Sequence, residues 1–452
     1  MSTTIDRLVY QQHVIRKIAW RLIPFLMVCF FTAFLDRVNI GFAALTMSSA
    51  LGLTPAIFGV GAGLFFLGYI IFEVPSTWIM ARVGPRLWIG RIMISWGILS
   101  ALTAFVTGER SFYLARALLG TAEAGFFPCM VYYLSQWFPR AERTRMLALF
   151  FVAIPMSSVI GAPVSALIMV HFDSVGSLAG WQWLFVLEAL PAIVMGVAAL
   201  IFLPDGPEHA SWLSESEARW LSETMTREQD VLEAGEHLSV LRALTDWRVL
   251  LMCIIQLGIV IGATGAAIWM PQIVKAFGLT TIQTGLVTAI PSIAMAITMV
   301  VASRHADRTG ERVWHVAAPF LFSAAGFLLA AFASTPVVSL IGLTIGAAGL
   351  GGAVPTFWLF PTILLTRAAA AAGIALINSA GSAGGFFGPA AIGWIRELTG
   401  TFSGALVFLA IVCAISAIVT LLLGKMMRDQ LQPDINETGE RTQGNVPSVV
   451  EG

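Results

Sequence analysis

The chain is divided into twelve apolar segments, each long enough to cross a bilayer as an α-helix. Only 12% of its 452 residues are charged and 57% are hydrophobic, a composition typical of a polytopic membrane protein and not of a soluble enzyme. We therefore predict an all-α membrane protein with twelve transmembrane helices. Their approximate spans are 21–45, 56–80, 86–107, 111–137, 144–171, 181–203, 247–276, 281–303, 313–333, 336–362, 368–395 and 402–427.

The distribution of basic residues predicts the orientation of these helices. With the N-terminus placed inside, 21 of the 26 Lys and Arg residues fall in the two tails and in alternate loops. Three lie in the intervening loops (Arg110, Lys275 and Arg396), and Arg37 and Arg116 lie within the membrane. By the positive-inside rule both termini are cytoplasmic. The polar start of the chain has no small-residue cleavage site, so we expect a cytoplasmic tail and a multi-pass protein of a bacterial-type inner membrane.

One long polar interruption, residues 204–246, divides the chain into halves. We predict four regions: an N-terminal six-helix half (1–203), a cytoplasmic linker (204–246), a C-terminal six-helix half (247–428) and a disordered cytoplasmic tail (429–452). Ser214 and Glu217 have the spacing of a capping box, which predicts a surface helix from about Glu215 to Arg227. Its apolar residues could face either the membrane or the bundle; they are Trp212, Leu213, Trp220 and Leu221.

The two halves carry related loops. Gly84-Pro-Arg86-Leu-Trp88 matches Gly310-Glu-Arg312-Val-Trp314 at an offset of 226 residues, half of the chain. Both sequences follow the second helix of their half. Internal repeats of six helices are typical of secondary transporters.

These loops resemble the loop signature of the major facilitator superfamily. The second copy is complete (Ser303, Asp307, Arg308, Gly310 and Arg312), whereas Ala81 stands where the first copy would carry its Asp. Arg116-x-x-x-Gly120 matches a further signature of the superfamily. Segments 35–43, 123–128 and 180–188 look like the anion:cation symporters, nearest to bacterial tartrate, phthalate and hydroxyphenylacetate permeases. The resemblance covers about residues 15–427 and implies two pseudo-symmetric six-helix halves and transport of an organic anion.

Four charged residues inside the predicted helices are candidates for the transport site. Insertion of Asp36 and Arg37 into an apolar run costs a few kcal/mol, so such residues usually face a polar interior and carry function. At about 1.5 Å per residue, Asp36 lies roughly 22 Å from the inner face and Arg116 roughly 9 Å from the outer face, nearly one level in a core of about 30 Å. Glu123 follows Arg116 by two helical turns and shares its face.

The charge count suggests how proton and anion binding are linked. Two acids balance two bases, so an incoming anion is uncompensated until Asp36 or Glu123 takes up a proton and frees an arginine. We therefore predict Asp36 and Glu123 as proton-coupling residues, and Arg37 and Arg116 as ligands of the anion. None of the six histidines lies near mid-membrane. The resemblance implies the same roles; the alternative is a static ion-pair network joining the first and fourth helices.

The positions 226 residues after these charges, in the C-terminal half, are glycines. We therefore expect the C-terminal half to recognise the shape and hydroxyl groups of the substrate. The remaining substrate-binding candidates are Phe34, Tyr69, Gln256, Thr356, Trp358 and Asn378. The alternative for each of them is packing or interhelical hydrogen bonding.

A cytoplasmic gate is expected at the repeated loops. Its candidates are Arg82, Gly84, Arg86, Asp307, Arg308, Gly310 and Arg312, which would latch helices at the inner face in an outward-facing state. Glu73 could pair with one of these arginines; membrane anchoring is the alternative for the basic residues. We read Glu188, on the sixth predicted helix, as structural.

These features predict proton-coupled import of a small organic acid anion by alternating access. A tartrate-like hydroxy acid, a sugar acid or an aromatic acid would fit; the alternatives are an anion exchanger or uniporter and, more remotely, a transporter-like sensor. We expect the four cysteines to be free, buried thiols. The sequence shows no nucleophile, metal-cluster or cofactor motif that would suggest an enzyme. We expect protons as the coupling ion and no other cofactor. The expected partners are the anion and the bilayer, with no nucleic acid, and the protein is predicted to be a monomer.

Overall fold

The computed structural model describes residues 2–139, 142–143, 146, 153–233, 245–364 and 367–427. Within these ranges the chain is helical, and its only strand-like pairing is an isolated bridge between Val175 and Leu178. The predicted all-α class is confirmed. The predicted tail, 429–452, lies outside the described residues.

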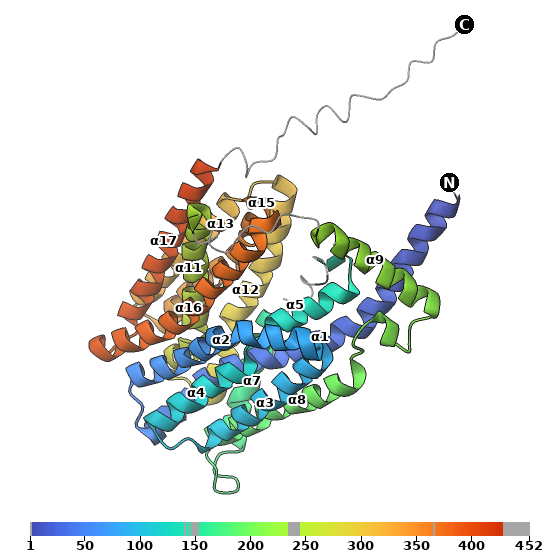
Figure 1. Ribbon diagram of the computed structural model, residues 1–452. Helices are drawn as coiled ribbons and strands as arrows, with labels where there is room; N and C mark the ends of the chain where they lie inside the picture. Colours follow the sequence, from blue (N-terminus) through green and yellow to red (C-terminus); the bar gives the residue numbers. More distant parts are fainter. Residues whose placement is uncertain are drawn as a thin grey trace.

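Two helical bundles lie side by side, one from each half of the chain (Figure 1). The N-terminal bundle contains α1 (Ser2–Leu51), α2 (Pro55–Val83), α3 (Pro85–Leu102), η1 (Thr103–Phe105), α4 (Glu109–Glu123), α5 (Phe126–Trp137), α7 (Ala153–His171) and α8 (Gly180–Phe202). The linker contains η2 (Pro207–His209) and α9 (Glu215–Glu233). The C-terminal bundle contains α11 (Trp247–Lys275), α12 (Thr281–Thr309), α13 (Trp314–Ala331), α14 (Pro336–Phe357), α15 (Leu359–Leu364), α16 (Arg367–Thr399) and α17 (Ser403–Met426).

The predicted membrane segments all have helical counterparts in the described parts of the chain. Eleven helices, with α4–α5 and α14–α15 each taken together, are long and apolar enough to cross a membrane. The remaining predicted segment, 368–395, corresponds to α16, which packs between α2 and α11. Two predictions need adjustment. The expected N-terminal tail is the start of α1, and Cys253 is only partly buried, unlike the other three free cysteines.

The repeated loops have matching backbones. Gly84 ends α2 with a φ of +89°, and Gly310 ends α12 with a φ of +67°. Side chains rarely adopt such angles, which explains why glycine stands at both positions of the repeat.

The linker helix packs against the N-terminal bundle. The capping box forms as predicted: the Ser214 N–H donates to Glu217 Oε2 at 2.8 Å, and the Glu217 N–H donates to Ser214 Oγ at 3.3 Å. Trp212 stacks on Trp137 at 5.7 Å, and Leu221 is fully buried. The apolar face of this segment therefore covers the bundle and not the membrane, and α9 extends to Glu233, beyond the predicted end.

An ion pair fixes α9 to the N-terminal third of α1. Lys17 Nζ lies 2.7 Å from Glu217 Oε2. Burial opposes the charge on Glu217, but the hydrogen bonds from Lys17 and from the Ser214 N–H bring the pKa of this carboxyl below its usual value. The start of α1 therefore serves as a support for the linker.

We call the end of the molecule that holds the start of α1, α9 and the end of α17 the termini face, and the opposite end the far face (Figure 1). The two bundles meet closely toward the far face, where α2 packs against α16 and α7 against α12. A Cβ on Gly59 would lie 2.4 Å from Pro389 O, and one on Gly393 would lie 2.3 Å from Pro55 O. The missing side chains thus allow backbone-to-backbone contact between the halves.

One cross-half hydrogen bond at the far face gives a prediction. Glu397 Oε2, near the end of α16, accepts the Ala56 N–H at 2.8 Å in the first turn of α2. A carboxylate is favoured at a helix N-terminus, so Glu397→Gln should weaken far-face closure. We expect roughly two- to fivefold faster labelling of a cysteine placed at Ala62, which is fully buried here, by an impermeant maleimide. Glu109→Gln, an acid in the first turn of α4, is the control; equal labelling rates in both variants would contradict the assignment.

Candidate transport site

The acid and base at positions 36 and 37 of α1 point toward different helices. Successive residues on a helix are about 100° apart, so the Asp36 and Arg37 side chains leave α1 in different directions. Ser100 Oγ of α3 donates to Asp36 Oδ1 in a short hydrogen bond, and the Asp36 side chain is buried. Arg37 reaches the end of α4 and keeps 23% of its side chain exposed. Asp36 is thus enclosed, whereas Arg37 is accessible.

The chain breaks its helix where it positions Glu123. The fourth predicted helix ends at Glu123 and restarts as α5 at Phe126, with Gly125 at a φ of +83°. Ser76 Oγ donates to Ala124 O at 2.6 Å and so satisfies a carbonyl that the break releases. Irregular backbone at membrane depth is tolerated where protein or a polar cavity surrounds it. The break fixes the Glu123 carboxylate at a helix terminus.

Arg37 and Glu123 form an ion pair in which two donors of the guanidinium share one carboxylate oxygen. Arg37 Nε donates to Glu123 Oε1 at 2.9 Å, and Arg37 Nη2 makes a second, shorter contact with the same oxygen. Glu123 is fully buried, and its Oε2 has no hydrogen-bond partner among the described residues. The accessible arginine is therefore held by a carboxylate that retains an unused oxygen.

Arg116 lies behind this pair. Its side chain is 1% exposed, and its Nε and Nη1 have no hydrogen-bond partner within the described ranges. It is within electrostatic range of Asp36, Glu123 and Arg37. The four predicted charges are therefore brought together, but Arg116 does not share the exposure of Arg37. Unpaired donors on Arg116 and unpaired oxygens on both acids leave the cluster ready to rearrange.

Aromatic rings surround the two guanidinium groups. Arg37 lies 4.9 Å from the ring centroid of Phe34, 5.3 Å from that of Phe65 and 5.5 Å from that of Tyr69. Arg116 lies 5.2 Å from the Phe65 centroid. Cation–π contacts of this kind orient an arginine while leaving its N–H groups free for a ligand. Phe34 and Tyr69 were predicted; Phe65 was not, although its i, i+4 spacing from Tyr69 on one helix face could have indicated it.

Gly120 permits this arrangement. A Cβ there would lie 1.8 Å from Phe65 O, so α2 and α4 touch directly beside the charges. Gly120→Ala should force the helices apart, lower stability by about 1–3 kcal/mol and abolish transport. The thermal midpoint and the uptake rate would be measured together. Gly206→Ala, where an added Cβ meets nothing within 4 Å, should change neither; normal uptake by Gly120→Ala would refute the close-contact role.

The C-terminal candidates do not share one environment. Asn378 Nδ2 of α16 donates to Glu73 Oε1 of α2 at 3.3 Å, so it joins the two halves. Gln256 and Thr356 are buried, and Gln256 Oε1 and Thr356 Oγ1 have no partner among the described residues. Trp358 follows α14 and packs against Phe357 at 5.6 Å. Among the described residues, Asn378 is the one member of this group that forms a side-chain hydrogen bond with the N-terminal half.

The pairing expected for Glu73 differs from the one observed. We predicted a loop arginine as its partner, but among the described residues Glu73 bonds to Asn378 instead. The position explains the difference. Glu73 lies more than two turns before the end of α2 and faces α16, whereas Arg82, in the last turn of α2, stacks on Trp78 at 3.5 Å.

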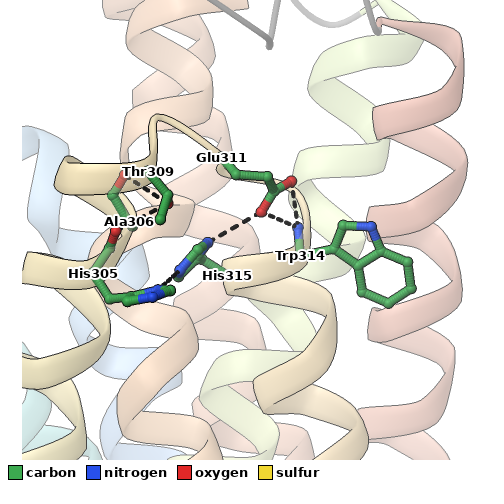
Figure 2. A network of polar contacts seen from close by, with 6 residues as sticks. All are labelled: His305, Ala306, Thr309, Glu311, Trp314 and His315. Atoms are coloured by element: carbon green, nitrogen blue, oxygen red, sulfur yellow. Dashed lines mark hydrogen bonds and ion pairs between the residues drawn. The ribbon is translucent and has the colours of Figure 1, made fainter.

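The predicted gate residues lie around two ordered loops at the termini face. Arg86 Nη1 is 3.5 Å from Asp205 Oδ2, and Asp307 and Arg308 are exposed in the last turn of α12. Figure 2 shows how the second loop is held: Glu311 accepts the Trp314 N–H at 2.9 Å, and His315 bridges Glu311 at 3.1 Å and His305 at 2.6 Å. The latch expected from Arg308 and Arg312 belongs to an outward-facing state and stays a prediction.

Two further polar residues contact the cluster, and neither had been predicted to belong to the site. Ser100 bonds to Asp36, and Asn39 Nδ2 donates to Asp36 Oδ1 at 3.3 Å. Asn39 follows Asp36 by three residues and so shares its face, which was a usable signal. A serine on another helix gives no such signal. Glu188, which we predicted to be structural, is buried on α8 and accepts a hydrogen bond from Ser165 Oγ of α7 at 2.7 Å.

Comparison with known proteins identifies the class of protein to which this fold and site belong. Residues 26–389 match the family model of the Major Facilitator Superfamily. The fold agrees: a bacterial homologue of the human lysosomal transporter Spinster, in its inward-facing, unoccupied conformation, superimposes with a TM-score of 0.72 at 15% identity, covering 92% of this chain and 99% of that one. The protein belongs to the Major Facilitator Superfamily. It is a multi-pass transporter of the inner membrane, and not an enzyme.

Closer relatives lie among bacterial permeases. A protein of Agrobacterium vitis named "Putative tartrate transporter" is 50% identical over 415 residues, 92% of each chain. The metabolite transport protein NicT of Pseudomonas putida is 43% identical over 392 residues, 86% of this chain and 90% of its own. The resemblance inferred from the motifs is confirmed at the level of the family and its organic anion permeases.

Proposed function

We propose that the protein imports a small organic acid anion together with protons by alternating access. The observation that carries this proposal is the Arg37–Glu123 pair: an arginine of a membrane-spanning helix, with 23% of its side chain exposed, is paired with a fully buried carboxylate. Arginine stays charged at all working pH values and grips carboxylates in a fork geometry. Glu123 therefore occupies the position that a substrate carboxylate would take.

Protonation of Glu123 links the two ligands. Once Glu123 is neutral, its attraction for Arg37 weakens, and the guanidinium can bind the substrate anion. The charges of Asp36, Arg37, Arg116 and Glu123 sum to zero when all are ionised, so one proton compensates one incoming negative charge. Each ligand thereby raises the affinity for the other by the same factor. Asp36 supplies a second proton site beside the first.

Arg116 has a different part in this scheme. Its guanidinium is buried, so in this state it interacts with the acids and does not reach solvent. When Arg37 turns to the substrate, the free N–H groups of Arg116 can take over the unpaired oxygens of Asp36 and Glu123. Arg116 would thus keep the cluster neutral while Arg37 carries the anion.

The substrate is proposed to be a hydroxylated or aromatic organic acid. Agrobacterium vitis relatives named for tartrate favour a hydroxy acid. Tyr69 lies beside Arg37, and the Glu73–Asn378 pair adds polar groups one turn further along α2. Gln256, Thr356 and Trp358 are proposed to contact the remainder of the substrate. No cofactor other than protons is proposed, and the partners are the anion and the surrounding lipid, with the protein acting as a monomer.

The test is uptake into proteoliposomes. Tartrate, a sugar acid, phthalate and hydroxyphenylacetate would be offered with and without an inwardly directed proton gradient. Accumulation above equilibrium that disappears with a protonophore supports the proposal. Flux that does not depend on the proton gradient identifies an exchanger or uniporter. The absence of flux for every acid rejects organic anion transport.

A further inference from the structure

The break between α4 and α5 has a cause in the sequence. In a continuous α-helix the Ala124 carbonyl would accept the N–H of the residue four positions later. That residue is Pro128, which has no N–H and whose ring would collide with the carbonyl. Ala124 is fully buried, so the missing donor must come from the protein. The carbonyl therefore needs a hydrogen bond from another part of the fold.

Ser76 of α2 supplies this hydrogen bond. Its Oγ donates to Ala124 O at 2.6 Å, and only 5% of the residue is exposed. Gly125, the residue after Ala124, makes the approach possible, because a Cβ at this position would lie 2.3 Å from Ser76 Oγ. A serine hydroxyl has a single hydrogen and can turn about its C–O bond. Its orientation is fixed when a second group donates to the same oxygen.

The second group is the indole of Trp88. Trp88 Nε1 of α3 donates to Ser76 Oγ at 2.9 Å, and the Arg91 guanidinium lies 3.8 Å from the centroid of the indole ring. Trp88 ends the first of the two repeated loop sequences. We call the indole N–H, the serine hydroxyl and the Ala124 carbonyl the serine bridge. Through its two hydrogen bonds the serine bridge joins the loop sequence to the residue that follows Glu123.

The C-terminal half provides an internal comparison. The counterparts of Ser76, Ala124 and Pro128, 226 residues later, are Ala302, Leu350 and Val354. α14 is a continuous helix through this position, and Trp314, the counterpart of Trp88, is 55% exposed. Glu123 corresponds to Gly349. The break and the serine bridge thus belong to the half that carries the acid, which indicates that they serve Glu123 and not the helical fold common to both halves.

We propose that Ser76 and Trp88 are positioning residues of the transport site, which hold the Glu123 carboxylate against Arg37 by fixing the peptide that follows it. The Nε–Oε1 distance of 2.9 Å between Arg37 and Glu123 leaves little tolerance, because a hydrogen bond weakens steeply when its length or angle changes. Loss of the serine bridge would free the Ala124 peptide and displace the carboxylate. The inference rests on the proposed function for its meaning in proton coupling, but the hold on the ion pair can be measured separately.

The first test needs no substrate. It is a double-mutant cycle on the thermal midpoint of the purified protein in detergent, with Ser76→Ala and Glu123→Gln as the two changes. Ser76→Ala should lower the midpoint by about 2–4 °C, because the Ala124 carbonyl loses its donor and the ion pair is displaced. In the Glu123→Gln background the loss should be about half as large, since no carboxylate is left to hold. Equal losses in the two backgrounds would overturn the proposal.

Two further variants accompany the cycle. Ser323 is the matched control: it is a buried serine of α13 whose Oγ donates to Gly346 O of α14 at 2.8 Å. Ser323→Ala should lower the midpoint equally with and without Glu123→Gln. Trp88→Phe keeps an aromatic ring beside Arg91 but removes the N–H donor. It should lower the midpoint in the wild type and not in Ser76→Ala, where the acceptor is already missing; an equal loss in both would remove Trp88 from the serine bridge.

The second test is uptake into proteoliposomes. Ser76→Ala should retain counterflow and lose proton-driven accumulation by roughly two- to fivefold, as expected for one weakened hydrogen bond, whereas Ser323→Ala should accumulate normally. In a protein that accumulates the anion, unchanged accumulation by Ser76→Ala would also overturn the proposal. An additive thermal cycle would leave proton-driven uptake standing and reject the positioning role. A coupled cycle without proton-driven uptake would reject the proposed function and keep the hold of Ser76 on Glu123.

Discussion

Glu123→Gln will eliminate concentrative uptake while preserving substrate exchange. Glutamine keeps an oxygen that can accept from Arg37, but it carries no charge to compete with an anion. Arg37 is then available to substrate at every pH, and no proton is required for binding. Each coupled proton contributes about 1.4 kcal/mol per unit of pH gradient, or roughly tenfold accumulation, and this factor should disappear in the variant.

The measurement pairs two assays on the same proteoliposomes. Accumulation under a proton gradient should fall to the equilibrium level, whereas counterflow of labelled against unlabelled substrate should continue and lose its dependence on pH. Glu223→Gln, an exposed acid of α9, controls for the loss of a negative charge. Unchanged accumulation by Glu123→Gln would remove this residue from the coupling scheme. If Glu123→Gln lost counterflow as well, the Arg37–Glu123 pair would serve to hold α1 and α4 together and would not couple protons to transport.

The sequence predicted the positions of the charges in depth but not their pairing. Helical rise placed Asp36, Arg37 and Arg116 near one level and Glu123 two turns further along the same face as Arg116, and the structure brings the four together. Exposure could not be derived this way, because it depends on how Phe65 packs over Arg116 through contact with Gly120. The difference between a partly exposed Arg37 and an enclosed Arg116 therefore follows from tertiary packing and not from depth.

The hydrogen-bond partners that buried acids find on other helices could not be predicted from the sequence either. Ser100, Ser165 and Asn378 bond to buried acids on neighbouring helices, and no local pattern relates residues that lie tens or hundreds of positions apart. By contrast, local rules worked well. The capping box at Ser214 and Glu217 formed as expected, and the loop glycines of the repeat both adopt positive φ. Local backbone chemistry is encoded in short segments, whereas side-chain pairing follows from tertiary packing.

Arg37→Lys will weaken substrate binding by roughly 10- to 100-fold, as expected when one charge-assisted hydrogen bond is lost. Lysine preserves the positive charge but offers neither the fork geometry nor the planar surface that packs among Phe34, Phe65 and Tyr69. A smaller effect would mean that charge alone attracts the anion. Arg227→Lys on α9, where the side chain is 75% exposed, provides the matched control.

Arg37→Ala should have the larger effect because it also changes Glu123. Without Arg37 the anion has lost its cationic ligand, and Glu123 has no substrate-binding guanidinium for which to compete, so binding should become both very weak and independent of pH. Equilibrium binding measured against pH distinguishes the two variants: Arg37→Lys keeps a pH dependence at reduced affinity, whereas Arg37→Ala loses it. If Arg37→Ala retained wild-type affinity, the anion would bind elsewhere, and the guanidinium occupied by Glu123 would not mark the substrate position.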